Sequence, residues 1–264
     1  MTYCLSICSG CPTHGVHPNE YGSAVAPGYQ VWVNGLAVAK HVDDYTLLNM
    51  AGNVTGKAIL EIGCGTGNCT KPLKRMGARR VVGLDCSPAM LQVAQAEEDR
   101  SPLGIEYIVG DMFAPAIVGS FDLVVASGVL SVSPTREHLL KAGQMAFNNL
   151  TAGGRFIVFD MNPELSPKVY PLCEKYGFKL STLGPLEEGA IIVCSIPAGD
   201  KQLVFHSYYH SHADYEWALR TAGFQTIRWR RPMVSPEGLQ EFGEEFWHDY
   251  VECPMSIYLE CVKG

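Results

Sequence analysis

Short apolar runs alternate with amphipathic stretches along the chain from Lys57 onward. The runs are rich in Ile, Val and Leu, and glycine or polar residues bound them, which is typical of buried strands. The stretches between them have the apolar spacing of helices. This alternation predicts βαβ units and a mostly parallel sheet, so we expect an α/β fold. The predicted strands cover residues 57–63, 79–85, 104–111, 121–128 and 153–161.

Helices are expected between these strands. Residues 68–77 predict a helix that ends at Gly77. The next predicted helix starts at an N-cap serine, Ser87, with Pro88 at the first helical position. A third helix is expected over residues 136–150.

The regular alternation breaks after Asn162. Residues 164–178 read as a short helix, and residues 190–209 read as two β-segments around a Pro-Ala-Gly-Asp turn, which predicts an antiparallel hairpin. We expect this insertion to cover the substrate. The rest of the chain predicts a helix over 213–221, a strand over 225–231, a helical piece around 239–251 and a last strand over 255–262.

No internal repeat and no low-complexity linker divides the sequence. We therefore expect a single domain over residues 1–264, with an antiparallel last strand. Its expected parts are an N-terminal arm with cap helices (1–50), a ligand-binding core (57–162), an inserted cover (163–211) and the C-terminal part of the sheet (212–264).

Charge and composition narrow the function classes. The chain has 20 Lys and Arg against 27 Asp and Glu, a net charge of −7, and no basic stretch, so nucleic acid is not an expected partner. No apolar segment reaches the roughly 18 residues of a membrane helix, and the first residues lack the basic start of a secretory signal. The ten cysteines are scattered, several in apolar runs, which favours free thiols and a cytoplasmic protein.

A glycine loop, "ILEIGCGTGNCT", follows the first predicted strand. Gly63, Gly65 and Gly67 allow positive φ angles and a close approach of a ligand to the backbone at a helix N-terminus. The spacing is G-x-G-x-G, with Asn68 where a dinucleotide fingerprint has its last glycine. Glu61 precedes the loop, and a carboxylate there suits an ammonium group better than a pyrophosphate. A tight turn without a ligand is the alternative interpretation.

Two further acids end predicted strands. Asp85 ends the second strand, where an acid accepts hydrogen bonds from ribose hydroxyls in nucleotide-binding sheets. Asp111 ends the third strand, with Met112 beside it, in a position to accept from an adenine amino group. The alternative for Asp85 is an ordinary acid flanking a helix.

Five segments together resemble the ordered motifs of class I S-adenosylmethionine-dependent methyltransferases. They are "LEIGCGTG", "GLDCSPAMLQVA", "YIVGDMF", "FDLVVASGVL" and "AGGRFIVFD", within residues 57–162. The resemblance implies a Rossmann-like sheet and S-adenosyl-L-methionine as cofactor, with S-adenosyl-L-homocysteine as product. It also implies contacts of the methionine moiety with Glu61, Gly63, Gly65, Gly67 and Ser127, of the ribose with Asp85, and of the adenine with Cys86, Met90, Asp111 and Met112.

Segments outside this core are similar to small-molecule methyltransferases of the toxoflavin-forming N-methyltransferase type. They are "EYGSAVAPGYQ", "YYHSHADYEWALRTAGF" and "SPEGLQEFGEEFW". The likeness implies that Tyr21 and Tyr29 belong to a segment that folds over the cofactor. It implies an N or O nucleophile on a small aromatic or heteroaromatic metabolite, with N favoured, in secondary metabolism.

The acceptor is expected at the carboxyl ends of the fourth and fifth strands, because ligands collect at this edge of open parallel sheets. Asn162 follows the fifth strand, and the predicted hairpin ends in Tyr209 and His210. We take these three residues as the candidate acceptor site. Aromatic walls with a few polar groups suit a planar ring.

Three other features receive no chemical role. His206, His210 and His212 form a cluster, but Ser211 between the last two is a predicted N-cap, so a metal site is not expected. Asp122 reads as an exposed turn residue at a strand start. The aromatic run "EFGEEFWHDY" reads as core packing.

The cysteines near the N-terminus have a suggestive spacing. Cys4, Cys8 and Cys11 read C-x3-C-x2-C, as in radical S-adenosylmethionine enzymes that hold an iron–sulfur cluster. No strand fits before Cys4, and the chain already carries the motifs of a non-radical site for the same cofactor. We therefore interpret the triplet as part of an N-terminal arm, with a thiol role toward a soft metal or metalloid left open.

Two other functions are alternatives to that of a small-molecule methyltransferase. A nucleic-acid methyltransferase should carry an Asn/Asp-Pro-Pro-aromatic motif after the fourth strand, where this chain reads "SGVL". A protein that keeps the fold and cofactor but catalyses a cyclisation, or only binds, would retain every motif quoted above. The sequence leaves the acceptor's identity, a general base and the oligomeric state open.

Overall fold

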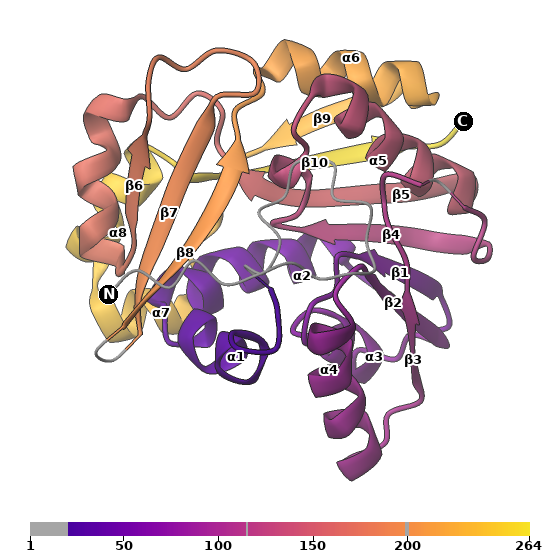
Figure 1. Cartoon of the computed structure of the whole chain (residues 1–264). Coiled ribbons are helices and arrows are strands. Elements are labelled where there is room, and N and C mark those ends of the chain that lie inside the picture. Colours follow the sequence, from indigo (N-terminus) through magenta and orange to yellow (C-terminus); the bar gives the residue numbers. More distant parts are fainter. Residues whose placement is uncertain (1–20, 115, 199–200) are drawn as a thin grey trace.

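The computed structural model of the chain describes residues 21–114, 116–198 and 201–264. Within these residues, seven strands form the main sheet in the order β3-β2-β1-β4-β5-β10-β9 (Figure 1). The β3 to β5 part is parallel, and β10 runs antiparallel to both of its neighbours, as predicted. The strands are β1 (Ala58–Ile62), β2 (Arg80–Asp85), β3 (Ile105–Val109), β4 (Phe121–Ser127), β5 (Leu150–Met161), β9 (Thr226–Arg230) and β10 (Ser256–Val262).

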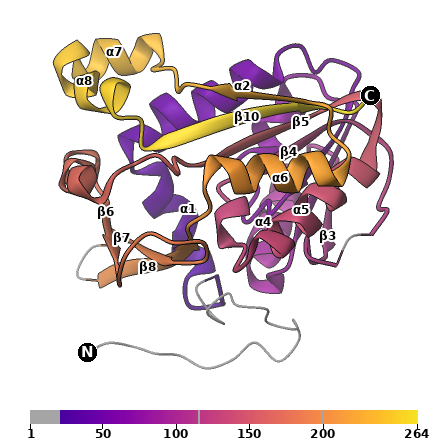
Figure 2. The same cartoon turned by 90° about the horizontal axis from the view of Figure 1, so that it is seen from above.

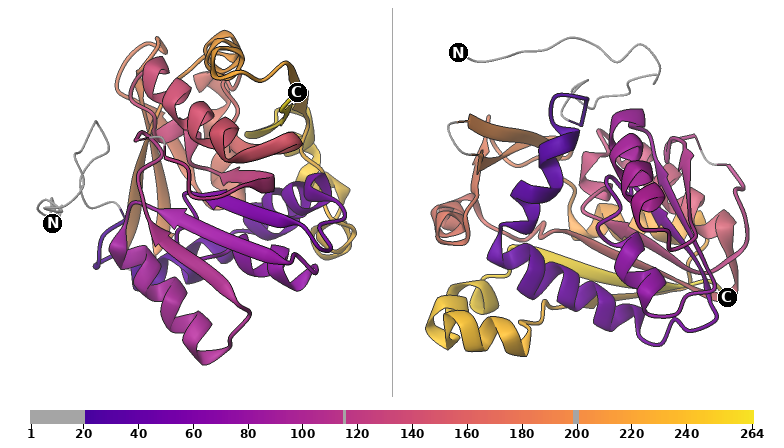
Figure 3. Two further views of the ribbon diagram at one scale, coloured as in Figure 1. Left: turned by 90° about the vertical axis from the view of Figure 1, so that its right-hand side faces the viewer. Right: turned by 90° about the horizontal axis from the view of Figure 1, so that it is seen from below.

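The predicted α/β, Rossmann-like fold is therefore confirmed, and helices pack on both faces of the sheet. Figures 2 and 3 show α2 (Tyr45–Ala51) on one face and α5 (Arg136–Asn149) with α6 (His212–Ala222) on the other. Successive strand residues point to opposite faces, so adjacent positions enter different cores. In β1, Ile59 packs with α2 and α3 (Thr70–Arg75), whereas Leu60 packs with α5 and α6. Burial on both faces explains the nearly continuous apolar runs of the sequence.

Two predicted helix starts are confirmed by their caps. The Ser87 hydroxyl accepts a hydrogen bond from the Met90 amide at the start of α4 (Pro88–Arg100). Ser211 forms a capping box with Asp214 at the start of α6. Such caps satisfy amide groups that have no partner inside the helix.

The insertion after β5 forms a separate small sheet. A 3₁₀-helix (Pro167–Tyr176) leads into β6 (Lys179–Thr182), β7 (Ile191–Ala198) and β8 (Lys201–Tyr208), which pair antiparallel. The predicted hairpin is β7–β8, but β6 was not predicted, because its four residues acquire a strand partner only through β7. Figure 1 shows this sheet beyond the arrowheads of β4 and β5, where a cover was expected.

Helices precede β1, and the first of them lies beside the cover, where Tyr29 packs with Phe205 of β8. They are α1 (Ala26–Asn34), a π-helix (Ala39–Asp44) and α2. Cys4, Cys8 and Cys11 lie outside the described residues, so the interpretation of the triplet stays a prediction.

Two expectations were wrong in detail. The helical piece around 239–251 is two helices, α7 (Pro236–Phe242) and α8 (Glu244–Glu252), because Gly243 between them adopts φ +80°. Asp122 is not an exposed turn residue: it lies within β4, partly buried, and its carboxylate accepts a hydrogen bond from the Ala58 amide at 2.8 Å. The aromatic run did prove to be core, since Trp247 and Tyr250 are buried.

A carboxylate joins the π-helix to the sheet. One oxygen of Asp43 accepts hydrogen bonds from Tyr258 at 2.9 Å, Ser256 at 3.1 Å and Tyr250 at 3.4 Å. Burial raises the pKa of Asp43 to about 7, and the hydroxyl donors only partly offset this effect. The three donors come from α8 and β10, so this contact fixes the N-terminal helices against the last strand.

Asp43→Asn should change how stability depends on pH. The ordinary pKa of the carboxyl is 3.8 and its folded value is about 7, so between these values the folded protein binds a proton that the unfolded chain releases. Asp43 therefore makes the wild type lose stability as pH rises through this window, by about 1.4 kcal/mol per pH unit. Asparagine does not titrate, so the stability difference between wild type and variant should shrink at this rate.

Urea unfolding of both proteins across the window measures this difference. Asp99→Asn, at an exposed position near the end of α4, is the matched control and should follow the wild type. A difference between wild type and Asp43→Asn that stays constant with pH would contradict the prediction.

Candidate active site

The glycine loop between β1 and α3 needs its glycines for two reasons. Gly63 has φ +69°, and a Cβ there would lie 2.5 Å from Cγ2 of Val129. Gly67 has φ +83°, and a Cβ there would lie 2.5 Å from the Tyr107 hydroxyl. Side chains are disfavoured at such φ angles and do not fit in this space. The sequence prediction of a tight strand-to-helix turn is confirmed.

Glu61, at the end of β1, carries an unsatisfied buried oxygen. The residue is 2% exposed, and its Oε2 has no hydrogen-bond partner among the described residues. Burial raises the pKa of Glu61 well above its usual range, and the charges of Asp85 and Asp44 raise it further, against the Thr70 backbone and Lys71. A positively charged group of a ligand would pair with this oxygen and offset the cost of burying the carboxylate. A methionine-type ammonium fits this requirement.

Asp85, at the end of β2, holds two loops together. One carboxylate oxygen accepts from the Gly65 amide at 2.7 Å, and the other accepts from the Ser87 amide at 2.8 Å. Burial raises its pKa, while these two bonds oppose the rise. Each carboxylate oxygen has further lone pairs, so ribose hydroxyls could still donate to it. The predicted ribose role thus stays compatible with this geometry.

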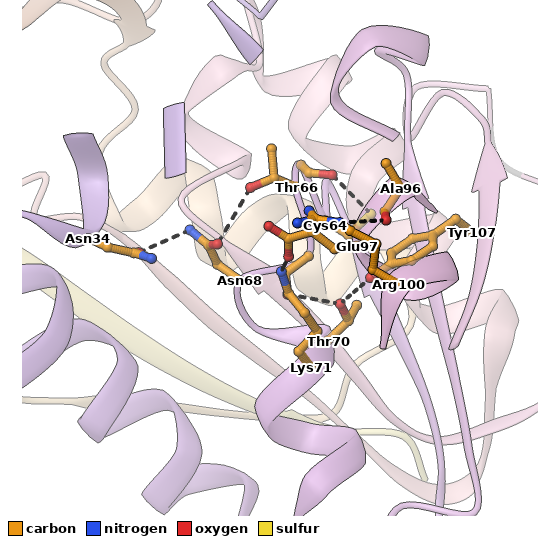
Figure 4. Close-up of polar contacts among 12 residues, drawn as sticks. Asn34, Cys64, Thr66, Asn68, Thr70, Lys71, Ala96, Glu97, Arg100 and Tyr107 are labelled. Carbon is orange, nitrogen blue, oxygen red and sulfur yellow. Dashed lines mark hydrogen bonds and ion pairs between the residues drawn. The ribbon is translucent and has the colours of Figure 1, made fainter. Parts of the chain in front are cut away.

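Figure 4 shows how the loop is tied to its surroundings. The Asn68 amide donates to the side chain of Asn34 of α1 at 3.3 Å, so the residue that replaces the last fingerprint glycine contacts the N-terminal cap. The hydroxyls of Thr70 and Tyr107 are 3.2 Å apart, and Lys71 forms an ion pair with Glu97 of α4. These contacts fix α3 against β3 and α4.

Tyr21 and Tyr29 lie between the acidic edge and the cover. The Tyr21 carbonyl accepts from the Ser87 hydroxyl at 2.7 Å, and its ring stacks on Phe205 of β8 with centroids 5.4 Å apart. The Tyr29 ring meets Phe205 edge-on at 5.8 Å. Burial raises the pKa of Tyr29 to about 12, and the charge of Asp85 contributes. The segment packs on the cover, and its expected contact with a cofactor stays a prediction.

The other predicted cofactor residues lie at the same edge of the sheet. Met90 is buried, with its methyl 3.9 Å from where a Gly65 Cβ would be, and Cys86 is exposed. Asp111 accepts from the Phe113 amide at 2.8 Å, next to the buried Met112. Ser127 is the last residue of β4 and is partly buried.

Together with the orphaned Glu61 oxygen, this arrangement fits an S-adenosylmethionine site. Glu61 would hold the ammonium, Asp85 the ribose, and Asp111 with Met112 the adenine edge.

The three candidate acceptor residues also come together. Asn162, Tyr209 and His210 line one pocket at the ends of β4 and β5. The Asn162 side chain is engaged at both ends: its amide donates to the Pro254 carbonyl at 2.7 Å, and its oxygen accepts from the Glu164 amide at 2.9 Å. Other residues of the lining include Ser131, Tyr170 and Tyr215.

Sequence reasoning missed two acids near this edge. Asp160 in β5 is 1% exposed and accepts from the Ser131 amide at 2.8 Å and from the Tyr215 hydroxyl at 3.4 Å. Burial raises its pKa. Asp44 of the π-helix lies close enough to raise the pKa of Glu61. An acid inside the apolar run "FIVFDM" was the available signal for Asp160.

Within the described residues, no group of three or more His, Cys, Asp or Glu is placed to hold a metal ion. In the same part of the chain, the helices are too short or too polar to cross a membrane.

Comparisons with known proteins agree with this geometry. Residues 59–169 match the model of the family described as a methyltransferase domain. The structure is similar to an S-adenosylmethionine-dependent methyltransferase of Mesorhizobium loti, with a TM-score of 0.61 and 20% identity over 88% of this chain and 100% of that one. The fold is that of class I methyltransferases. The resemblance read from the five sequence motifs is thereby confirmed at this level.

Curated relatives match part of the chain. A demethylmenaquinone methyltransferase of Lactococcus lactis is 33% identical over 44% of this chain and 46% of its own length. A ubiquinone biosynthesis O-methyltransferase of Azorhizobium caulinodans is 38% identical over 40% of this chain and 41% of its own length. The chain thus aligns with less than half the length of these relatives.

Asp85→Ala should weaken binding of S-adenosylmethionine. A hydrogen bond to a charged group contributes about 1.5–3 kcal/mol, so affinity should fall roughly ten- to a hundredfold. Isothermal calorimetry with S-adenosylmethionine and S-adenosylhomocysteine measures the change. Asp99→Ala, on the exposed side of α4, is the control and should bind like the wild type. Unchanged affinity in a folded Asp85→Ala protein would contradict the ribose role.

Proposed function

We propose that this protein is an S-adenosylmethionine-dependent methyltransferase that acts on an N or O nucleophile of a small aromatic or heteroaromatic metabolite. One observation carries the proposal: the acids and glycine loop that fit the cofactor share a sheet edge with a pocket lined by tyrosines and a histidine. The acceptor would therefore meet the cofactor at the carboxyl ends of β4 and β5, where open parallel sheets bind ligands.

The chemistry asks little of the protein beyond alignment. The cofactor supplies an electrophilic methyl group when bound. The residues of this chain hold the acceptor in line with that methyl group and exclude water, and such positioning lowers the barrier without a metal. Burial of Glu61 strengthens its interaction with a cationic group of the ligand, because charges interact more strongly in a low-dielectric site.

The nature of the acceptor rests on the pocket. Tyr170, Tyr209 and Tyr215 line the pocket and supply flat apolar surface together with hydroxyl groups, which suits a planar ring. The curated relatives support this direction, since they are named for quinone-related methylation, one of them as an O-methyltransferase. The likeness to toxoflavin-forming enzymes supports nitrogen and a place in secondary metabolism. The test of the proposal therefore includes both oxygen and nitrogen nucleophiles.

Incubation of the purified protein with methyl-labelled cofactor and a panel of phenols and heteroaromatic amines tests the proposal. The expected result is a labelled product heavier by one CH2 group, together with S-adenosylhomocysteine. Cofactor binding without transfer to any acceptor, or cofactor consumption with a product of unchanged methyl count, would overturn it in favour of a binding or cyclising protein.

Tyr209→Ala should raise the KM for the acceptor and leave cofactor affinity within about threefold, a change of well under 1 kcal/mol. Tyr209 lines the pocket, and its backbone bonds to Gly189 and Ala190 do not need the side chain. Steady-state kinetics with the best acceptor of the panel measures the effect. Leu183→Ala, at a 79% exposed position of the insertion, is the control. An unchanged KM would mean that the acceptor binds elsewhere.

A further inference from the structure

His210 presents an unengaged nitrogen to the acceptor pocket. The residue lies between β8 and α6 and is 1% exposed. Its Nε2 is 2.7 Å from the carbonyl oxygen of Ser133. A carbonyl can only accept, so Nε2 carries the hydrogen, and Nδ1 of the neutral ring keeps a bare lone pair. Nδ1 is buried and has no hydrogen-bond partner among the described residues.

The neighbouring polar groups make hydrogen bonds to other partners, so the Nδ1 lone pair is available to a ligand. The Tyr215 ring stands nearly perpendicular to the imidazole at 6.3 Å, and its hydroxyl donates to Asp160. Asn162 already uses both ends of its amide. Nδ1 accepts a hydrogen bond from neither of them.

A buried hydrogen-bond acceptor without a partner destabilises the folded protein. Leaving such a group unpaired costs about 1–3 kcal/mol, and native proteins rarely keep one without a functional reason. His210 lines, together with tyrosines, the pocket in which the aromatic acceptor is proposed to bind. A ligand that donates a hydrogen bond to Nδ1 would recover this energy, so the pocket favours acceptors that carry an O–H or N–H.

We propose that Nδ1 of His210 accepts the proton that the acceptor loses when it is methylated; this inference rests on the proposed function. The lone pair of the acceptor oxygen or nitrogen forms the new bond to the methyl carbon. The carbon–sulfur bond breaks with its electron pair going to sulfur, and the O–H or N–H proton passes to Nδ1. The cationic sulfonium becomes a neutral thioether and neutral His210 becomes imidazolium, so charge is balanced.

The surroundings of His210 support both protonation states. Nε2 donates to the Ser133 carbonyl in the neutral ring and in the imidazolium, so the ring orientation is preserved. The titratable groups that line the same pocket are Tyr170, Tyr208, Tyr209 and Tyr215, and Asp160 accepts a hydrogen bond from the Tyr215 hydroxyl. The substrate class that follows is a neutral phenol or ring N–H, whose proton must leave during the reaction.

Ring ¹⁵N NMR of the wild type tests the resting state without a variant. In the protein loaded with S-adenosylhomocysteine, the His210 spectrum should show a protonated Nε2 and an unprotonated Nδ1. Phenol should then shift the Nδ1 signal, whereas anisole, which has the same ring but no O–H, should not. A protonated Nδ1, or equal effects of phenol and anisole, would overturn the proposal.

The variant His210→Gln tests the step itself. A glutamine amide still donates toward the Ser133 carbonyl but cannot take up a proton. With the acceptor found in the methylation panel, kcat should fall about 10²- to 10⁴-fold, the range of general base catalysis, and the acid limb of its pH profile should disappear. Cofactor affinity by calorimetry should stay within about threefold. His248→Gln, the same change at an exposed position of α8, should leave both unchanged.

The outcomes separate this inference from the proposed function. A folded His210→Gln protein with wild-type kcat and pH profile would overturn the proton-acceptor role while methyl transfer stands. A wild type that methylates nothing in the panel would overturn both. In that case, an NMR response to phenol would still identify the pocket as a binding site for hydroxyl donors.

Discussion

Backbone amides at the carboxyl edge of the sheet need acceptors, and buried carboxylates supply them. Asp85 accepts from the amides of Gly65 and Ser87, and Asp160 accepts from that of Ser131. A loop at this edge cannot leave its N–H groups unpaired once the cover excludes water. These acids therefore fix the loops that form the candidate site. Glu61 differs, because one of its oxygens has no partner among the described residues. That oxygen is available to a ligand.

The cover completes the site by packing on the N-terminal helix. Phe205 of β8 contacts the rings of Tyr21 and Tyr29, and Tyr21 is bound in turn to Ser87 at the start of α4. One aromatic cluster thus links the insertion, α1 and the edge where the cofactor is expected. Aromatic pairs of this kind contribute about 0.5–1.5 kcal/mol each beyond their buried area. The position of the cover is therefore tied to that edge of the sheet.

Much of the site was predictable because local chemistry determines it. The glycine loop, the Ser87 cap and the acids at strand ends follow from short patterns whose geometry depends on neighbouring residues. The short strand β6 was not foreseen, because it forms only by pairing with β7. Asp122 was misread for the same reason, since its partner, Ala58, is 64 residues away.

The sequence alone determined the parallel core, the order of the five motifs along its strands, and the residue types at the carboxyl edge of the sheet. These depend on hydrophobic periodicity and on backbone conformations that only glycine adopts easily. Tertiary structure alone decided which side chains are left without partners. The Asn162 amide donates to the carbonyl of Pro254, and Nε2 of His210 bonds the carbonyl of Ser133 while its Nδ1 has no partner among the described residues; Pro254 and Ser133 both lie far from these residues along the chain. Hydrogen-bond satisfaction is a property of the assembled fold, and no local pattern encodes it.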